Sequence, residues 1–153
     1  MKPAQYFALI VGILFVLIGI AGFIPELVQP PLADPDVVHL GYTQGYGYLM
    51  GLFPINVLHN IVHLAVGLLG ILASISWDSS RLYSGALALF YGSLTIFGLI
   101  PATQTTLGLI PIFGNDIWLH ASTAAIATYF GFIATPDLAQ MARGAKDQAT
   151  SAR

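Results

Sequence analysis

Cysteine is absent from the 153 residues of this chain. Disulfides, thiolate catalysis, iron–sulfur clusters and cysteine-based zinc sites are therefore excluded. Charge is also scarce, because charged residues make up only 8% of the sequence, against roughly 25% in an ordinary soluble domain. Five Lys and Arg residues against seven Asp and Glu residues give a net charge of -2. This balance leaves no basic surface on which nucleic acid would bind.

Hydrophobic residues make up 56% of the chain and gather in four long runs. The runs are Tyr6–Ile24, Ile55–Ile75, Leu82–Ile100 and Ile117–Thr135, each close to the roughly 20 residues of a spanning helix. Lipid offers no hydrogen bonds to the backbone, and the runs lack the alternation of barrel strands. We therefore expect an all-α, four-transmembrane-helix bundle over residues 1–135, followed by a cytoplasmic, partly disordered tail over residues 136–153.

The basic residues lie on one side of this expected topology. One precedes the first run, one lies in the short turn before the third run, and three lie in the tail: Lys2, Arg81, Arg143, Lys146 and Arg153. Lys and Arg that flank membrane spans are retained on the cytoplasmic side. The sequence therefore predicts a multi-pass membrane protein with both termini in the cytoplasm.

A short motif occurs twice in the chain. Gly51–Ile55 reads GLFPI, and Gly108–Ile112 reads GLIPI. Continuing both copies without a gap places His63 on His120. This coincidence indicates an internal duplication in which the second and fourth runs are equivalent.

The ends of the first and third runs also match, because residues 20–25 resemble residues 96–101. The chain therefore reads as two helical hairpins of the same kind. Both hairpins start on the cytoplasmic side, so we expect two tandem parallel repeats related by an axis along the membrane normal.

The polar residues inside the second and fourth runs are the candidates for a functional site. Asn56, His59 and His63 are three or four residues apart, so they share one side of a helix. The repeat places Asp116 and His120 at the equivalent depth of the fourth run. Polar groups within a span are costly and usually face the interior of the bundle. We expect these side chains to converge between the second and fourth spans.

Such a set is compatible with three interpretations. In the first, His63 and His120 are axial ligands of a haem, or ligands of another tetrapyrrole such as chlorophyll, with Asn56 and His59 beside it. In the second, His59, His63, His120 and Asp116 bind a transition metal. In the third, the histidines and the asparagine hydrogen-bond across helices and hold no ligand. The sequence leaves all three open.

The residues between Gly51 and Gly70 resemble a known family. They read Gly-x-x-Pro-x-Asn-x-x-His-Asn-x-x-His and then Gly67 and Gly70, similar to a bacterial family of small four-helix integral membrane proteins with no assigned function. The resemblance covers residues 5–135, and this sequence resembles cyanobacterial members of the family. It implies a four-span protein of the plasma membrane or the thylakoid membrane, and it marks Asn56, His59 and His63 as positions to test.

The sequence predicts a non-catalytic membrane protein. No serine or threonine stands in a context for nucleophilic catalysis, and no glycine-rich loop for phosphate is present. We expect an accessory or structural component that contacts the lipid bilayer and docks on a larger membrane complex or forms a homo-oligomer. The alternatives are a small transporter or channel, and a membrane subunit of a quinone-linked oxidoreductase.

Overall fold

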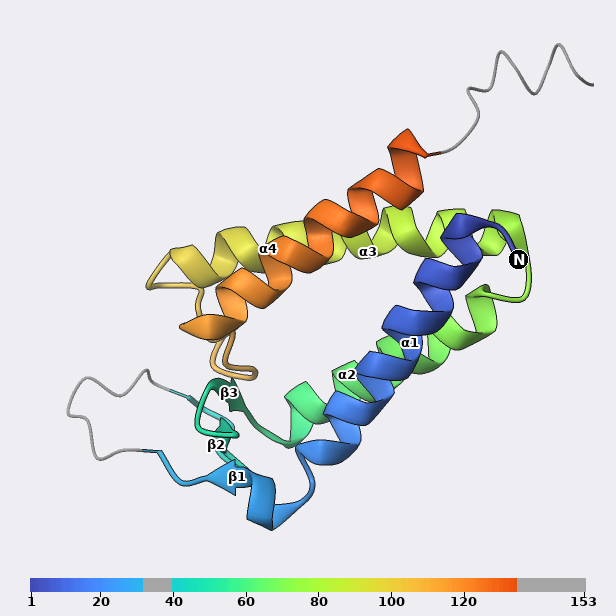
Figure 1. Ribbon diagram of the computed structural model, residues 1–153. Helices are drawn as coiled ribbons and strands as arrows, with labels where there is room; N and C mark the ends of the chain where they lie inside the picture. The colour runs from blue at the N-terminus through green and yellow to red at the C-terminus, as the bar shows by residue number, and fades with distance from the viewer. Residues whose placement is uncertain (32–39, 135–153) are drawn as a thin grey trace, which may run out of the picture.

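The computed structural model describes residues 1–31 and 40–134, and within them the chain is mostly helical (Figure 1). The expected tail over residues 136–153 lies outside this part. The α-helices are α1 (Pro3–Ala21), α2 (Val57–Ala73), α3 (Trp77–Leu99) and α4 (Asn115–Thr128). A 3₁₀ turn, η1 (Pro25–Leu27), follows α1, and a π-helical turn, η2 (Tyr129–Ile133), continues α4.

The helices form two antiparallel pairs that cross at an angle (Figure 1). α1 packs against α2, and α3 packs against α4. The N-terminus and the turn between α2 and α3 lie at one end of the molecule. The strands and the loop between α3 and α4 lie at the other end, which places the start of α2 next to the start of α4.

The loop after α1 contains a small antiparallel sheet, so the chain is mostly helical rather than all-α. Its strands are β1 (Val28–Gln29), β2 (Gly47–Leu49) and β3 (Phe53–Ile55), in the order β1-β2-β3. Val28 pairs with Leu49, and Leu49 pairs with Phe53. Met50 and Gly51 have φ angles of 53° and 71° and make the turn between β2 and β3. The sheet forms because this turn reverses the chain directly before α2.

The helix bounds depart from the four apolar runs, mainly at the third and fourth. α3 begins at Trp77, five residues earlier than Leu82, because the Ser76 side chain caps the helix by accepting a hydrogen bond from Ser79 N (3.1 Å). α4 keeps α-helical geometry for 14 residues and then widens into η2. Among the described helices, α1 and α3 are long and apolar enough to cross a membrane. α2 is apolar but has 17 residues.

Glycines allow α1 and α2 to approach closely. Gly12 of α1 and Gly67 of α2 face each other, and a Cβ on Gly67 would lie 2.7 Å from the Gly12 oxygen and from the Val16 nitrogen. The pair is also joined near the N-terminus of α1, where the Gln5 amide donates to the Ser74 carbonyl oxygen at the end of α2 (2.9 Å). Small residues at a helix interface let the two backbones pack in direct contact.

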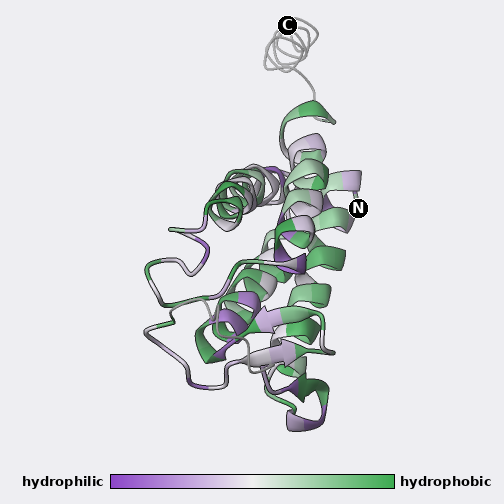
Figure 2. Ribbon diagram, turned by 90° about the vertical axis from the view of Figure 1, so that its left-hand side faces the viewer, coloured by the Kyte–Doolittle hydropathy of each residue, from purple (hydrophilic) through white to green (hydrophobic). Residues whose placement is uncertain are grey.

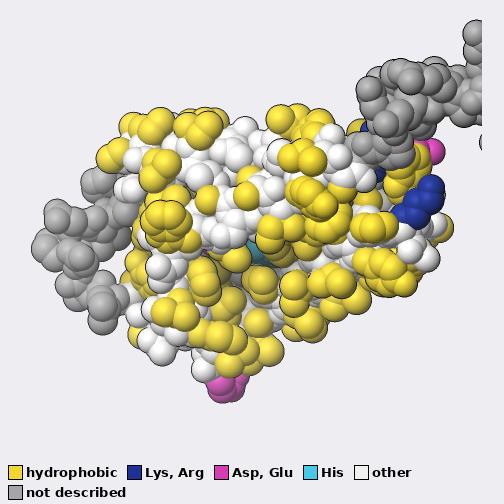
Figure 3. All heavy atoms as spheres, turned by 45° about the horizontal axis from the view of Figure 1, so that its top comes forward, with side chains coloured by type: hydrophobic (Ala, Val, Ile, Leu, Met, Phe, Trp, Pro, Cys, Tyr) yellow, Lys and Arg dark blue, Asp and Glu magenta, His cyan; other side chains and the backbone are white. Residues whose placement is uncertain are grey.

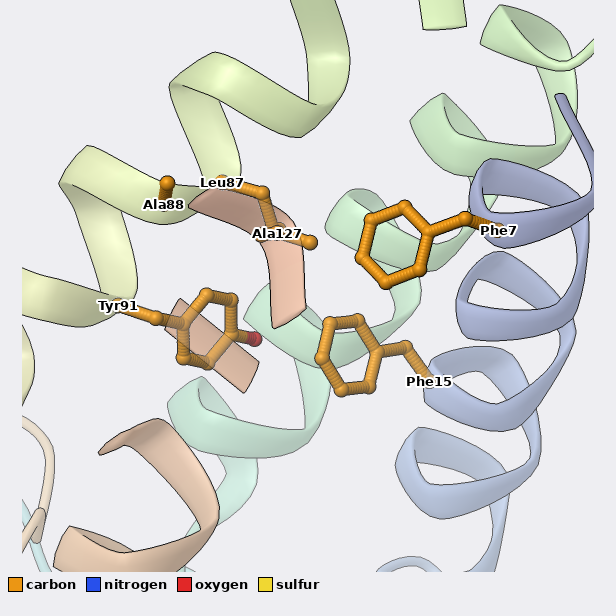
Figure 4. Packing of buried hydrophobic residues seen from close by; sticks show 6 residues of the cluster. All are labelled: Phe7, Phe15, Leu87, Ala88, Tyr91 and Ala127. Carbon is orange, nitrogen blue, oxygen red and sulfur yellow. The ribbon is translucent and has the colours of Figure 1, made fainter. Parts of the chain in front are cut away.

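The hydrophobic core is small and aromatic. It joins α1, α3 and α4 through six buried side chains, shown in Figure 4: Phe7, Phe15, Leu87, Ala88, Tyr91 and Ala127. Phe15 and Tyr91 point toward each other across the bundle, with ring centroids 5.3 Å apart. This aromatic pair holds the two helical hairpins together at mid-height.

Most of the large hydrophobic side chains lie on the outside of the molecule. Leu72, Leu89 and Ile133 are 62%, 69% and 66% exposed, and they belong to three different helices or turns. In Figure 3 hydrophobic side chains cover most of the visible face, with Lys and Arg at one end. Figure 2 shows that hydrophobic residues make up much of each helix. Since the buried set is rich in Asn, His and Ser, the molecule is more polar inside than an ordinary soluble domain.

We predict that Gly67→Ala destabilises the protein because the new Cβ meets backbone atoms of α1 that cannot turn aside. Overpacking of this kind costs about 1–3 kcal/mol of unfolding free energy. The measurement is chemical unfolding in detergent micelles followed by circular dichroism. Gly92→Ala on α3 is the matched control, because nothing lies within 4 Å of its new Cβ. Equal loss of stability in both variants would contradict the packing argument.

Candidate metal centre at the start of helices α2 and α4

Asn56 sets the position of α2. Its side-chain oxygen caps the helix by accepting a hydrogen bond from His59 N (2.9 Å). Its amide nitrogen donates to the carbonyl oxygens of Tyr42 (3.2 Å) and Leu109 (2.7 Å). Because both ends of the buried amide are engaged, Asn56 connects three segments of the chain. In this structure it positions the candidate site and offers no free ligand atom.

His59 is fixed in one tautomer by the backbone before the helix. Its Nδ1–H donates to the Pro54 carbonyl oxygen (3.1 Å), so in a neutral ring Nε2 carries the lone pair. This nitrogen lies 3.0 Å from His63 Nε2, one helical turn further along α2. A histidine whose second nitrogen donates to a carbonyl is the usual arrangement of a metal-binding imidazole.

α4 brings a carboxylate and a third imidazole to the same place. Gly114, with a φ of 65°, precedes the helix and turns the chain into it. Asp116 Oδ2 then lies 3.7 Å from His59 Nε2 and 3.5 Å from His120 Nε2. His59, Asp116 and His120 each place one ligand atom within 4.8 Å of the others. His63 adjoins this group through its contact with His59.

Several polar atoms of the group are buried without a hydrogen-bond partner in the described part of the chain. They are Asp116 Oδ2, His63 Nδ1 and both ring nitrogens of His120. Asp116 is 1% exposed and His120 is fully buried. Buried polar atoms in proteins are nearly always hydrogen-bonded, and each exception needs an explanation. A bound cation would explain Asp116 Oδ2 and one ring nitrogen of His120, because a metal takes a lone pair from a carboxylate oxygen and from one nitrogen of an imidazole.

Two aromatic rings support the histidines, and the sequence did not single either of them out. Phe15 packs edge-on against His63, with centroids 5.2 Å apart. Tyr91 packs against His120 at 5.0 Å. The sequence did contain an indication of their equivalence, because extending the match between the first and third runs without a gap aligns Phe15 with Tyr91.

A cavity of about 260 Å³ lies beside the histidines, between α2, α3 and the loop that precedes α4. His59, His63 and His120 line one side of it, whereas Asp116 does not. Most of the remaining wall is aliphatic or aromatic. Figure 3 also shows a histidine side chain in a narrow gap among hydrophobic side chains.

The structure thus brings together the side chains proposed for a metal site. His59, Asp116 and His120 form the compact group, and His63 is adjacent to it. Asn56, grouped with the histidines as a cofactor-binding residue, lies at the same end of α2 with its amide engaged by backbone. Asp116, which only the repeat singled out, lies between two of the imidazoles.

The fold and the site define a mostly helical protein with apolar, membrane-length helices and a buried cluster of histidines and a carboxylate. The chain belongs to the family of the Domain of unknown function DUF4383, whose model matches residues 5–133. No curated protein and no solved structure matches the chain. The expected membership of an uncharacterised family is therefore confirmed, and the function has to be argued from the site.

We predict that Asn56→Ala lowers the stability of the protein by about 2–4 kcal/mol, because it removes a helix cap and leaves two carbonyl oxygens without their donor. The free energy of unfolding in detergent measures the effect. Asn115→Ala is the control, since the exposed Asn115 makes one hydrogen bond, to the Leu52 carbonyl oxygen (3.2 Å). If Asn56→Ala were as stable as Asn115→Ala, the hydrogen bonds of Asn56 would not be needed to hold the start of α2 in place.

Proposed function

We propose that this protein is a multi-pass membrane protein that holds a divalent transition-metal ion between α2 and α4. The observation that carries the proposal is the convergence of His59, Asp116 and His120 within 4.8 Å in a buried position. Two imidazoles and one carboxylate are a common ligand set for iron and for zinc. Ligand atoms of a tetrahedral ion bound at about 2.0–2.2 Å lie roughly 3.3–3.6 Å apart, close to the 3.7 Å and 3.5 Å that separate Asp116 Oδ2 from His59 Nε2 and His120 Nε2.

The surface of the molecule supports four membrane crossings. α1 and α3 have membrane length by themselves. α2, with 17 residues, lies at the short end of the roughly 17–25 residues that span a bilayer, and α4 is extended by η2 to Ile133. Exposed leucines and isoleucines on all of them face outward, where lipid would cover them. A polar interior and an apolar exterior are what the bilayer requires of a bundle.

The distribution of charge supports a cytoplasmic N-terminus. Lys2 and Arg81 lie at the same end of the bundle and both stack on Trp77, at 4.2 Å and 4.9 Å from its ring. Trp and cations together are typical of the membrane interface, and cations favour the cytoplasmic side. We propose that this end faces the cytoplasm and that the sheet and the metal centre lie toward the opposite face.

Three pairs of matching features support a tandem duplication of the hairpin. Met50 and Gly51 have φ angles of 53° and 71°, and their equivalents Leu107 and Gly108 have 60° and 82°. The carbonyl oxygens of the equivalent residues Leu109 and Leu52 each accept a hydrogen bond from an asparagine of the other hairpin, Asn56 and Asn115 respectively, although the repeat does not align these two asparagines. The aromatic contacts of His63 and His120 also correspond. These contacts between residues are Asn56–Leu109, Asn115–Leu52, Phe15–His63 and Tyr91–His120.

The packing favours a metal ion over a tetrapyrrole. A haem or chlorophyll between His63 and His120 would need a flat space between the two imidazoles. The His59 ring packs against both of them, with centroids 4.8 Å from His63 and 6.4 Å from His120. The adjoining cavity of about 260 Å³ lies below the roughly 300–1,000 Å³ of most cofactor sites. A metal ion needs only the space between the ligand atoms. We therefore propose a mononuclear metal centre in a non-catalytic membrane component.

We predict that single-cysteine variants report the orientation, because the chain has no cysteine of its own. Leu52→Cys lies in the turn before β3 and Ser79→Cys near the start of α3, and both positions are exposed. A membrane-impermeant maleimide added to intact bacterial cells should label Leu52→Cys and should label Ser79→Cys only after lysis. The reverse pattern would refute the proposed orientation.

We predict that the purified protein binds one Co²⁺ or Zn²⁺ ion per chain and that Asp116→Asn and His120→Ala each reduce the affinity by about 100-fold or more, because each removes a ligand. Competition with a chelating dye measures the affinity, and the visible absorption of Co²⁺ reports its coordination. Asp78→Asn is the matched control, since Asp78 is an exposed carboxylate near the start of α3. If both ligand variants bound the metal as tightly as the wild-type protein, these residues would not be metal ligands, and their role would be structural.

A further inference from the structure

The three residues of the compact group leave a coordination position open on one side. His59, Asp116 and His120 supply three ligand atoms. Metal centres that hold an ion for structure alone are usually closed by four protein ligands, whereas those that bind an external molecule keep a position free. His63 is not part of this group, and its Nε2 is hydrogen-bonded to His59 Nε2 at 3.0 Å. Because His59 Nδ1 donates to the Pro54 carbonyl oxygen, a neutral His63 donates to the His59 Nε2 lone pair, and a bound ion would replace this hydrogen bond.

The open side faces the cavity of about 260 Å³. The three histidines line this cavity and Asp116 does not, so the carboxylate closes the far side of the centre. The volume lies just below the roughly 300–1,000 Å³ of most ligand pockets. It suits a single ring with a short substituent better than a larger cofactor.

The walls of the cavity are apolar and reach the outer surface. Tyr91 and Ile112 are buried beside the histidines, whereas Leu94 is half-buried and Phe90 is 43% exposed. None of the described residues that line the cavity is a Lys, Arg, Asp or Glu. Because this part of the surface is covered by lipid in the proposed topology, a molecule that enters here comes from the bilayer. A charged or strongly hydrated ligand would not follow such a route.

We propose that the cavity binds a small, lipid-soluble ring compound carrying a hydroxyl group, a phenol in its simplest form, whose oxygen coordinates the metal ion. This inference rests on the proposed metal centre. The apolar walls enclose the ring, and the hydroxyl oxygen reaches the side lined by the imidazoles. Binding needs no covalent step, because the oxygen lone pair takes the open position.

The test uses the full chain in detergent, loaded with Co²⁺, and 4-ethylphenol as the probe. We expect saturable changes in the visible absorption of Co²⁺ when 4-ethylphenol is added, and none with ethylbenzene, which lacks the oxygen. Leu94→Trp fills the cavity from α3 without removing a ligand, and it should weaken the response by about tenfold or more. Ile96→Trp is the matched control, since Ile96 is 59% exposed on the same helix and does not line the cavity.

The outcomes separate the two proposals. Bound Co²⁺ whose spectrum does not respond to 4-ethylphenol would overturn the ligand site and leave the metal centre intact. Failure to bind Co²⁺ at all would overturn the metal centre and the ligand site with it. An equal response in Leu94→Trp and the wild-type protein would place the phenol outside the cavity. Val62→Phe provides the same test from α2 if Leu94→Trp does not fold.

Discussion

The amide of Asn56 holds the start of α2, the segment around Tyr42 and the loop before α4 at one point. The remainder of the site depends on this junction. The Asn56 side chain accepts a hydrogen bond from the backbone nitrogen of His59 and so fixes the first turn of α2. Its hydrogen bond to the Leu109 carbonyl oxygen keeps the loop that leads to α4 in place. At this end of the molecule Asn56 joins the hairpins together with the backbone of Gly41 and Tyr42, whose N–H groups donate to the Gly108 carbonyl oxygen. The Asn56 side chain therefore links the helix cap of α2 to the contact between the two hairpins.

The proposed membrane topology gives a physical reason for the position of this junction at the helix ends. In the middle of the bundle the two hairpins meet mainly through the apolar and aromatic core around Phe15 and Tyr91. Polar side chains gather at the start of α2 and α4, where turns supply free carbonyl groups such as that of Pro54. Large apolar side chains turn outward around this polar interior.

The sequence predicted the helices and the convergence of polar groups because both follow from periodicity. Residues three or four apart must share a face, and a gapless repeat carried Asp116 and His120 to the depth of His59. The sheet escaped prediction because its strands have two or three residues, too few for a pattern, and its turn depends on the left-handed backbone of Met50 and Gly51. The cavity depends on how two hairpins cross, which no local pattern encodes.

The burial of Asp116 is the strongest reason to treat the cluster as more than a hydrogen-bonded staple. A carboxylate removed from water loses several kcal/mol of solvation, which a partner must restore. Its oxygen Oδ2 lies 3.5 Å from His120 Nε2 and 3.7 Å from His59 Nε2, but it makes no hydrogen bond within the described residues. Histidines that only stapled the helices would point an N–H at this oxygen. Imidazole nitrogens arranged around a carboxylate at ligand spacing, without donating to it, are instead the arrangement that a shared cation stabilises.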